Sequence, residues 1–213
     1  MLRRRELMAD RGELPAGYRR CKYLESSGKQ IIVLPLSVAE TTNCELKAAF
    51  TGTSNINNII AFSRFSNYNA FYIGSNNYKW VFGTKSSKSS IIESVIKMDF
   101  VDDGKNPQSV MAHINGEPLY EQRYSRVEVP NNQKVALFGR VLSSGDKSPE
   151  FVGKIWYFAS TYLSPKKYNY IPCIRVTDGT AGMFDLHTKK FESNSGSGKF
   201  GYELMDGTYV APQ

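Results

Sequence analysis

The sequence predicts an all-β fold, an antiparallel β-sandwich of two sheets, over nearly the whole of its 213 residues. Tyr and Phe, which favour strands, contribute 13 and 12 residues. Short apolar segments recur along the chain, and clusters of Gly, Asn, Ser and Asp separate them as turns. No long helical periodicity is present after the first dozen residues. Together these observations favour roughly a dozen short strands joined by hairpin turns.

The composition indicates one large folded domain with a short extension at each end. Hydrophobic residues make up 41% of the chain, which suffices for an extensive core, and no Gly- or Pro-rich linker divides it. We therefore expect a basic N-terminal docking arm over residues 1–20, the sandwich over residues 21–203 and a C-terminal tail over residues 204–213.

The formal net charge of +7 is concentrated at the N-terminus. Residues 1–22 hold seven basic and three acidic side chains, so this segment carries +4 and the remaining 191 residues carry +3. The basic segment could touch nucleic acid, an acidic protein surface or a membrane face, or it could be a solvated tail. The folded body, by contrast, is not expected to contain a basic groove.

Residues 1–12 are able to form a short helix that ends at Gly12 and Pro15. A short isolated helix is marginal in water and becomes ordered only against a partner, which makes this segment a candidate docking arm. Its weak apolar stripe consists of Leu2, Leu7 and Met8.

The first strands follow the arm in order. A strand over residues 21–26, a turn over residues 27–29 and a strand over residues 30–34 that ends at Pro35 open the body. Residues 43–51 alternate apolar and charged side chains, so one face of this strand should lie on a core. Further strands are expected over residues 57–65, 70–75, 78–84, 91–101, 109–114, 117–123, 135–140 and 153–163.

Turns separate these later strands. Residues 85–90 are polar and are expected to form a loop, and Asn115-Gly116 predicts a two-residue type I′ hairpin. The apolar run over residues 153–163 is typical of a strand buried on both faces. Short extended pieces from Tyr170 onward, divided by turns such as Asp178-Gly179, should fold back over it.

The three cysteines, Cys21, Cys44 and Cys173, lie far apart in the sequence and form no C-x-x-C pair. We expect buried free thiols in a chain made in a reducing cytosol, without a disulfide framework or zinc site. No apolar run approaches the ~20 residues of a transmembrane helix, and charges interrupt any secretory signal.

We expect no catalytic, metal-binding or cofactor site. The acids Glu93, Asp99, Asp102 and Asp103 lie mostly in or beside a turn and do not form the acid pair of a glycosidase. His113 and His187 lack a metal-ligand neighbour at suitable spacing, so structural or surface roles are favoured. Calcium could use Asp102, Asp103 and Asn106, but a solvated turn is the favoured interpretation.

Aromatic side chains are dense between residues 62 and 82, and several Asn residues lie among them. Exposed aromatics can stack on sugar rings, whereas alternating aromatics are more often core. A weak glycan-binding hypothesis on this segment names Tyr72, Asn76, Tyr78 and Trp80.

Motifs near both ends carry a family resemblance: residues 23–30 (YLESSGKQ), 153–155 (GKI), 171–173 (IPC), 178–179 (DG), 182–185 (GMFD) and 195–198 (SGSG). Over residues 20–203 the chain resembles the LamG-like, concanavalin-A-like jelly-roll modules of phage virion proteins and gut-bacterial surface proteins. In that family the terminal strands close the sandwich side by side. Residues 31–34 and 192–194 depart from the family pattern, which puts in doubt any ligand site at those positions.

The resemblance implies a non-enzymatic virion component, located in a head, neck or tail fibre and assembled in the host cytoplasm. Residues 1–20 would anchor it to other virion proteins through Leu2, Arg3, Arg4, Arg5, Leu7 and Met8. The alternative is a carbohydrate-binding module or adhesin on the bacterial cell surface that recognises surface glycans. Association of several copies stays open, although no heptad seam supports a trimer.

Overall fold

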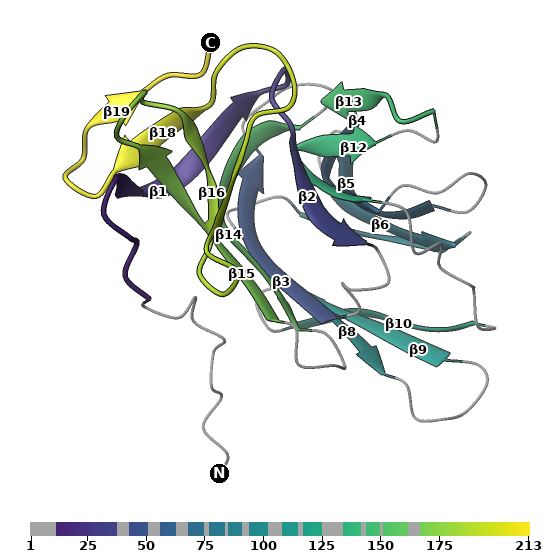
Figure 1. Cartoon of the computed structure of the whole chain (residues 1–213). Coiled ribbons are helices and arrows are strands. Elements are labelled where there is room, and N and C mark those ends of the chain that lie inside the picture. The colour runs from purple at the N-terminus through teal and green to yellow at the C-terminus, as the bar shows by residue number, and fades with distance from the viewer. Residues whose placement is uncertain are drawn as a thin grey trace.

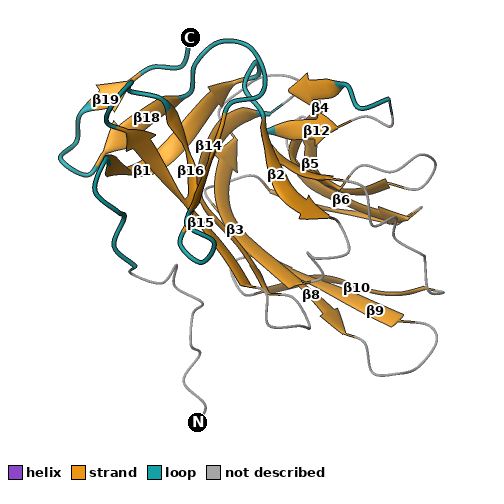
Figure 2. Ribbon diagram, in the orientation of Figure 1, coloured by secondary structure: helices purple, strands orange, loops and turns teal. Residues whose placement is uncertain are grey.

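The computed structural model describes the strands that form most of the chain, but neither the first eleven residues nor several segments between strands (Figure 1). Every element in the described part is a strand (Figure 2), which confirms the all-β prediction. Between residues 56 and 124 the description covers the backbone of the strands but not their side chains. The described residues are 12–37, 43–50, 56–62, 68–74, 77–83, 85–90, 94–101, 108–114, 117–124, 134–141, 144–149, 151–161 and 167–213.

The strands pair into two large sheets and one small one. Those of the larger sheet are β1 (Tyr18–Ser27), β3 (Asn43–Phe50), β8 (Ser94–Val101), β9 (Gln108–Ile114), β10 (Glu117–Tyr124), β14 (Val152–Thr161), β15 (Lys167–Arg175), β16 (Ala181–Asp185), β17 (Lys190–Ser193), β18 (Gly201–Leu204) and β19 (Tyr209–Val210). Those of the smaller sheet are β2 (Ile32–Ser37), β4 (Ile56–Phe62), β5 (Tyr68–Gly74), β6 (Asn77–Gly83), β7 (Lys85–Ser90) and β11 (Lys134–Leu137). The two-stranded sheet holds β12 (Gly139–Val141) and β13 (Lys147–Pro149).

All pairings in the described residues are antiparallel, and the curled sheets form the expected β-sandwich, compatible with a jelly roll. The larger sheet runs in the order β10-β9-β8-β3-β14-β1-β15-β16-β17, with β18 and β19 added beside β1, and the smaller in the order β2-β11-β4-β5-β6-β7. β3 alternates as predicted, because Cys44, Leu46 and Ala48 are buried between half-buried Glu45 and Lys47.

β14 corrects one prediction. The run was expected to be buried on both faces, but only one face is buried, through Gly153, Ile155, Phe158 and Ser160. The intervening side chains are half-buried, since β14 is central within its sheet while its second face lies toward the outside of the sandwich. The apolar run therefore indicates a strand in the middle of a sheet, not a strand with both faces buried.

β1, β14 and β15 form a three-strand junction, a name we keep for the region where each pairs with both others. β1 pairs with β14 through Leu24–Ser27 and with β15 through Tyr18–Arg20, while β14 pairs with β15 through Phe158–Thr161. All three pairings are antiparallel. Two straight strands that both run antiparallel to a third must run parallel to each other, so the strands have to change direction at the junction.

An irregular position in each strand permits that change. The register of β1 against β18 shifts between Cys21 and Tyr23, and the register of β14 against β3 shifts between Ile155 and Tyr157. Each shift lies where the strand exchanges one junction neighbour for the other. Such bulges bend a strand and increase its twist. In β15, Pro172 lies between the residues that pair with β14 and those that pair with β1. Proline has no N–H to donate, and at this position neither β1 nor β14 pairs with it, so the missing hydrogen bond destabilises the sheet least.

The first turn of the body is held by a buried glutamine. Gln30 is fully buried, and its Oε1 accepts hydrogen bonds from Ser26 Oγ at 3.0 Å, Ser27 N at 2.9 Å and Ser27 Oγ at 3.3 Å. Its Nε2 donates to the carbonyl oxygens of Lys199 at 3.0 Å and Gln213 at 2.8 Å. We call this set the glutamine clasp, because it ties the start of the sandwich to its last residues.

A neighbouring loop extends the clasp. The stretch over residues 195–198 is hydrogen-bonded to residues 29–31. Ser195 N donates to Ile31 O at 2.7 Å and Ser197 N to Lys29 O at 3.1 Å. A Cβ on Gly196 would lie 2.3 Å from Lys29 O, so a larger residue would break this contact.

The predicted domain limits fall inside structured regions. Tyr18–Arg20, assigned to the arm, belong to β1, and the tail over residues 204–213 contains β19 and returns to the clasp through Gln213. Residues 1–11 and their expected helix lie outside the described residues. The start and end motifs lie side by side as expected, because β1 pairs with β14, β15 and β18.

Two edge strands differ from the predictions. Pro35 was expected to end a strand, but β2 continues through it, and Lys85–Ser90 was expected to be a loop but forms β7. Both strands lie at the ends of the smaller sheet. An edge strand tolerates proline and strongly polar residues, because one of its sides needs no partner. The Asn115-Gly116 hairpin is supported by the pairing of Glu117 with Ile114, although the turn itself lies outside the described residues.

A kink interrupts the strand predicted over residues 135–140. Phe138 is fully buried and has a φ of 65°, an angle that non-glycine residues adopt at a cost. It separates β11 from β12, and its ring packs against Phe200 at a centroid distance of 4.8 Å. Burial of a large ring thus offsets the local backbone strain.

Replacing Gln30 by Ala should lower the free energy of unfolding by about 2 kcal/mol, because the substitution removes a fully buried amide that accepts from Ser26 and Ser27 and donates to two carbonyl oxygens near the end of the chain. Urea unfolding of the intact chain measures this change. The matched control is exposed Lys29→Ala, expected within about 0.5 kcal/mol of the parent. Equal stabilities of the two variants would show that the clasp contributes nothing.

Candidate functional site

The arm reaches the body through a packed segment, residues 12–18, which we call the arm base. Leu14 and Tyr18 pack against a buried cluster on β15, β16 and the following turn. The Tyr18 ring lies 4.9 Å from the Phe184 ring and 5.3 Å from the Phe191 ring, centroid to centroid. The buried cluster consists of Ile171, Cys173, Phe184 and Leu186.

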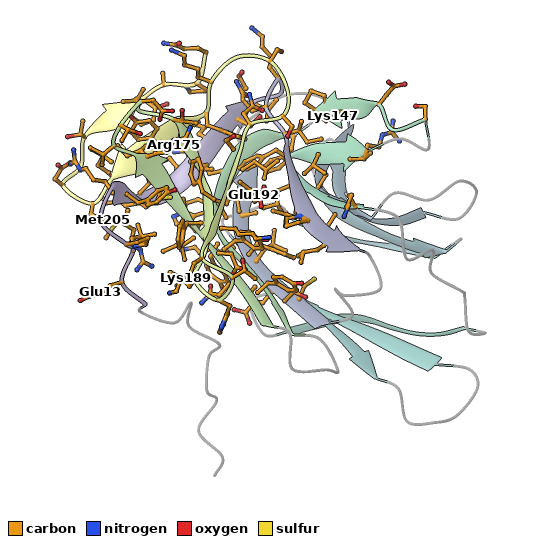
Figure 3. All side chains as sticks on the ribbon, viewed as in Figure 1. Glu13, Lys147, Arg175, Lys189, Glu192 and Met205 are labelled. Atoms are coloured by element: carbon orange, nitrogen blue, oxygen red, sulfur yellow. The ribbon has the colours of Figure 1, made fainter. Side chains whose placement is uncertain are left out.

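Backbone hydrogen bonds fix the arm base as well. Tyr18 N donates to Pro15 O at 3.3 Å, and Val176 N donates to Gly17 O at 2.8 Å. Glu13, in contrast, is exposed and points away from the body (Figure 3). The arm base therefore gives the preceding residues a fixed starting point beside β16.

The predicted docking residues themselves, Leu2, Arg3, Arg4, Arg5, Leu7 and Met8, lie outside the described residues. Of the basic residues that follow, Arg19 and Arg20 are exposed on β1. Arg19 Nη2 lies 3.2 Å from Asp206 Oδ2, an exposed ion pair of the kind that contributes little to stability.

The outer side of the three-strand junction carries aromatic rings covered by lysines. The rings of Tyr23 and Trp156 lie 5.4 Å apart, Lys154 Nζ lies 4.2 Å from the Tyr23 centroid, and Lys47 Nζ lies 5.0 Å from the Trp156 centroid. Burial raises the pKa of Tyr23, and the hydrogen bond from Lys154 opposes that rise. Cation–π contacts of this kind stabilise the junction where its backbone is irregular.

Sequence reasoning expected Trp156 to be packed within the sandwich and did not assign it to an outer surface. The register shift next to it leaves Trp156 and Tyr157 consecutively half-buried. Tyr157 donates a hydrogen bond of 2.6 Å to Glu45 Oε1. Lys154 and Trp156 lie two residues apart and therefore share one face of the strand. A lysine on that face was the signal in the sequence that the face is partly solvated.

The register of the smaller sheet places Tyr78 and Trp80 on its inner face. Directly paired residues share a face, and the pairs run from Ile32 to Leu137, Ile60, Phe71 and Trp80. Ile32 and Leu137 are fully buried. Tyr78 lies two residues from Trp80 in β6 and therefore shares that face. This placement favours the core interpretation of these aromatics.

Tyr72 lies on the other face of the same sheet. It pairs with Lys79, the neighbour of Tyr78 and Trp80, and Lys79 in turn pairs with Lys88 in β7. Asn76 lies outside the described residues. The structure therefore does not bring Tyr72 together with Tyr78 and Trp80 in one site.

Asp185 is a buried acid with a structural role. Its carboxylate accepts hydrogen bonds from the backbone N–H groups of Asn169 at 2.9 Å, His187 at 3.2 Å and Thr188 at 3.2 Å, and from the Thr188 hydroxyl at 2.5 Å. These donors hold the turn between β16 and β17, which contains His187. The described residues contain no group of three or more His, Cys, Asp or Glu side chains placed to hold a metal ion.

The other residues considered for catalysis or calcium binding have no described side chains. Asp99 and His113 lie in β8 and β9, where side chains are not described. Glu93, Asp102, Asp103 and Asn106 lie outside the described residues.

The three cysteines are free and buried, as predicted. Burial raises the pKa of the Cys21 and Cys173 thiols to about 12. The native protein should therefore resist a thiol-disulfide reagent at pH 8, while all three thiols react in concentrated urea. Rapid labelling of the native protein would contradict this burial.

The same shift predicts a pH dependence. A thiol has an ordinary pKa near 9, and the fold holds the protonated form of Cys21 and Cys173 more tightly than the unfolded chain does. Their contribution to stability is fully present below pH 9 and is lost as the pH rises toward 12. Urea unfolding at pH 8 and pH 10.5 measures the loss, which C21S/C173S should reduce.

No protein-family model matches this chain, and no curated protein matches it. In the described residues no helix is long and apolar enough to cross a membrane. The structure shows the all-β fold, and the resemblance to LamG-like modules rests on the sequence motifs.

Replacing Leu14 by Asp should detach the arm base, because an unpaired carboxylate cannot stay against the apolar cluster. The Val176 amide, which bonds to Gly17 O, should then exchange its hydrogen at least about tenfold faster while β14 amides keep their protection. Hydrogen exchange with mass spectrometry measures both. Glu13→Asn, at an exposed neighbour, is the matched control and should leave the Val176 rate unchanged.

Proposed function

We propose that this chain is a non-enzymatic structural component displayed on a phage particle, with the β-sandwich as the displayed body and the N-terminal arm as its anchor. The observation that carries the proposal is the arm base. Leu14 and Tyr18 are packed on the body, so the residues before Gly12 begin at a defined point on its surface. A tether that starts at a rigid point positions the body relative to its partner.

The chemistry of the arm suits an assembly contact. Residues 1–11 contain four arginines, Arg3, Arg4, Arg5 and Arg11, and an apolar set formed by Leu2, Leu7 and Met8. Arginine pairs with carboxylates through two parallel hydrogen bonds, and the apolar side chains gain free energy when a partner covers them. The partner that fits is an acidic protein surface with an apolar groove.

The body does not need residues 1–11 to close its fold. Its first and last segments are joined by the three-strand junction and by the glutamine clasp, both of which begin after Gly17. Two of the motifs that resemble phage LamG-like modules, residues 23–30 and 153–155, take part in these contacts, and this supports the virion assignment. An arm that is separate from the closure of the fold is available for a partner.

A phage that encodes this chain provides the test. Deleting residues 2–11, which leaves the arm base intact, should abolish incorporation into purified particles, as measured by immunoblot, without changing the thermal unfolding of the isolated protein. R3A/R4A/R5A should reduce incorporation strongly. The control K29A/K134A/K199A removes three exposed charges of the body and should incorporate normally.

Two results would refute the proposal. Normal incorporation of the arm-deleted chain would show that the arm is not the anchor. Absence of the parent protein from purified particles would show that the chain is not a virion component at all.

A further inference from the structure

The exposed apolar side chains of the body gather at one margin of the sandwich. Among the described residues, the large hydrophobic side chains with high exposure are Val176 at 55%, Met205 at 60%, Tyr209 at 51% and Val210 at 36%. Three of the four belong to the hairpin that β18 and β19 form with their connecting turn. Single exposed apolar residues are ordinary on a protein surface, whereas a group of them marks a contact surface.

Val176 joins this group through the start of β1. Val176 N donates to Gly17 O at 2.8 Å, and Arg19 Nη2 lies 3.2 Å from Asp206 Oδ2 in the turn after β18. The turn after β15 and the turn after β18 therefore flank the same short segment, residues 17–19, at the side of the sandwich that carries β19 (Figure 3). We call the two turns and β19 the turn margin, which consists of residues 176–180 and 205–210.

The turn between β15 and β16 holds Val176 in a fixed, exposed position. Gly179 N donates to Arg175 O at 2.9 Å, and Thr180 N donates to Asp178 Oδ1 at 3.0 Å. The Arg175 guanidinium donates to both oxygens of the Asp178 carboxylate and holds the pKa of that carboxyl well below its ordinary value. An ordered turn whose charges cancel thus presents the exposed valine.

The turn between β18 and β19 presents Met205 in the same way. Leu204 N donates to Thr208 O at 2.8 Å, and Thr208 N donates to Asp206 Oδ1 at 2.9 Å. The other carboxylate oxygen of Asp206 pairs with Arg19. Because hydrogen bonds already order this backbone, covering Met205 with a partner costs little further conformational entropy.

The charge of the turn margin favours a second copy of the chain as the partner. Its two acids, Asp178 and Asp206, are each neutralised by an arginine of the same chain. The chain as a whole carries +7, so two copies repel each other wherever that charge is exposed. A neutral apolar margin lets two copies approach, and it offers no charge that would select an acidic or a basic partner.

β19 adds a backbone edge that can pair with its own copy. It pairs with β18 and with no other strand of the described sheets, so its second edge presents unpaired backbone groups. Two β19 strands that meet antiparallel about a two-fold axis pair these edges with each other, which closes the contact at two copies. The exposed Tyr209 and Val210 side chains lie at this edge.

We propose that the turn margin is the contact between two copies of this chain, with β19 of one copy beside β19 of the other and with Val176 and Met205 covered. The arm leaves the body at the other end of the arm base, where a Cβ on Gly12 would lie 3.2 Å from Leu186 Cδ1. The contact therefore goes beyond the anchoring role proposed for residues 1–11 and does not depend on it.

Sedimentation equilibrium of the intact chain over a concentration series tests the contact. The parent should pass from the mass of one chain to the mass of two, and added salt should not weaken the association, because no unpaired charges form it. V176D and M205D should each weaken it by roughly tenfold, since the new carboxylate would be covered without a partner. The matched control S197D adds an acid at an exposed serine outside the turn margin and should associate like the parent.

Hydrogen exchange and an arm deletion complete the test. The peptide that contains Tyr209 and Val210 should exchange more slowly at high protein concentration, while β14 peptides stay unchanged. Deleting residues 2–11 should leave the association intact. A parent that sediments as one chain at every concentration, equal association of M205D and S197D, unchanged exchange of the β19 peptide, or loss of association without the arm would each overturn the proposal.

Discussion

The three-strand junction is the constraint on which the rest of the larger sheet depends. Buried backbone groups need hydrogen-bond partners, and β1, β14 and β15 satisfy theirs by exchanging neighbours halfway along each strand. The exchange requires a bulge in two strands and places a residue without an N–H, Pro172, in the third. Lysine and aromatic side chains cover the outer side of this irregular region, where Tyr23 and Trp156 meet.

Closure of the fold depends on contacts between the two ends of the sequence. The glutamine clasp joins Gln30 to Lys199 and Gln213, and β18 pairs with β1 beside it. The arm base packs against β15 and β16 of the same sheet. The body is thus closed by residues after Gly17, which leaves the preceding arm available for the anchoring role that we propose.

The arm and the smaller sheet illustrate different limits of sequence reasoning. The arm was identified from its local charge alone, because its arginines are consecutive. The separation of Tyr72 from Trp80 was missed, because it follows only from the register, which pairs Tyr72 with Lys79 and Phe71 with Trp80. The glycan-binding hypothesis grouped Tyr72 with Trp80 because they are close in sequence. Tyr72 pairs with Lys79, the residue next to Trp80 in β6, and adjacent residues of a strand lie on opposite faces.

The sequence by itself determined the all-β class, most strand positions, the alternation of β3 and the burial of three free cysteines, since period-two patterns and turn residues act over a few neighbours. Only the tertiary structure decided which strands lie at an edge, and so why Pro35 and the polar Lys85–Ser90 could be accommodated in strands. It also decided that Gln30 is buried and that β14 has one half-buried face. These features rest on partners distant along the chain, such as Gln213 for Gln30, and no local pattern encodes that distance.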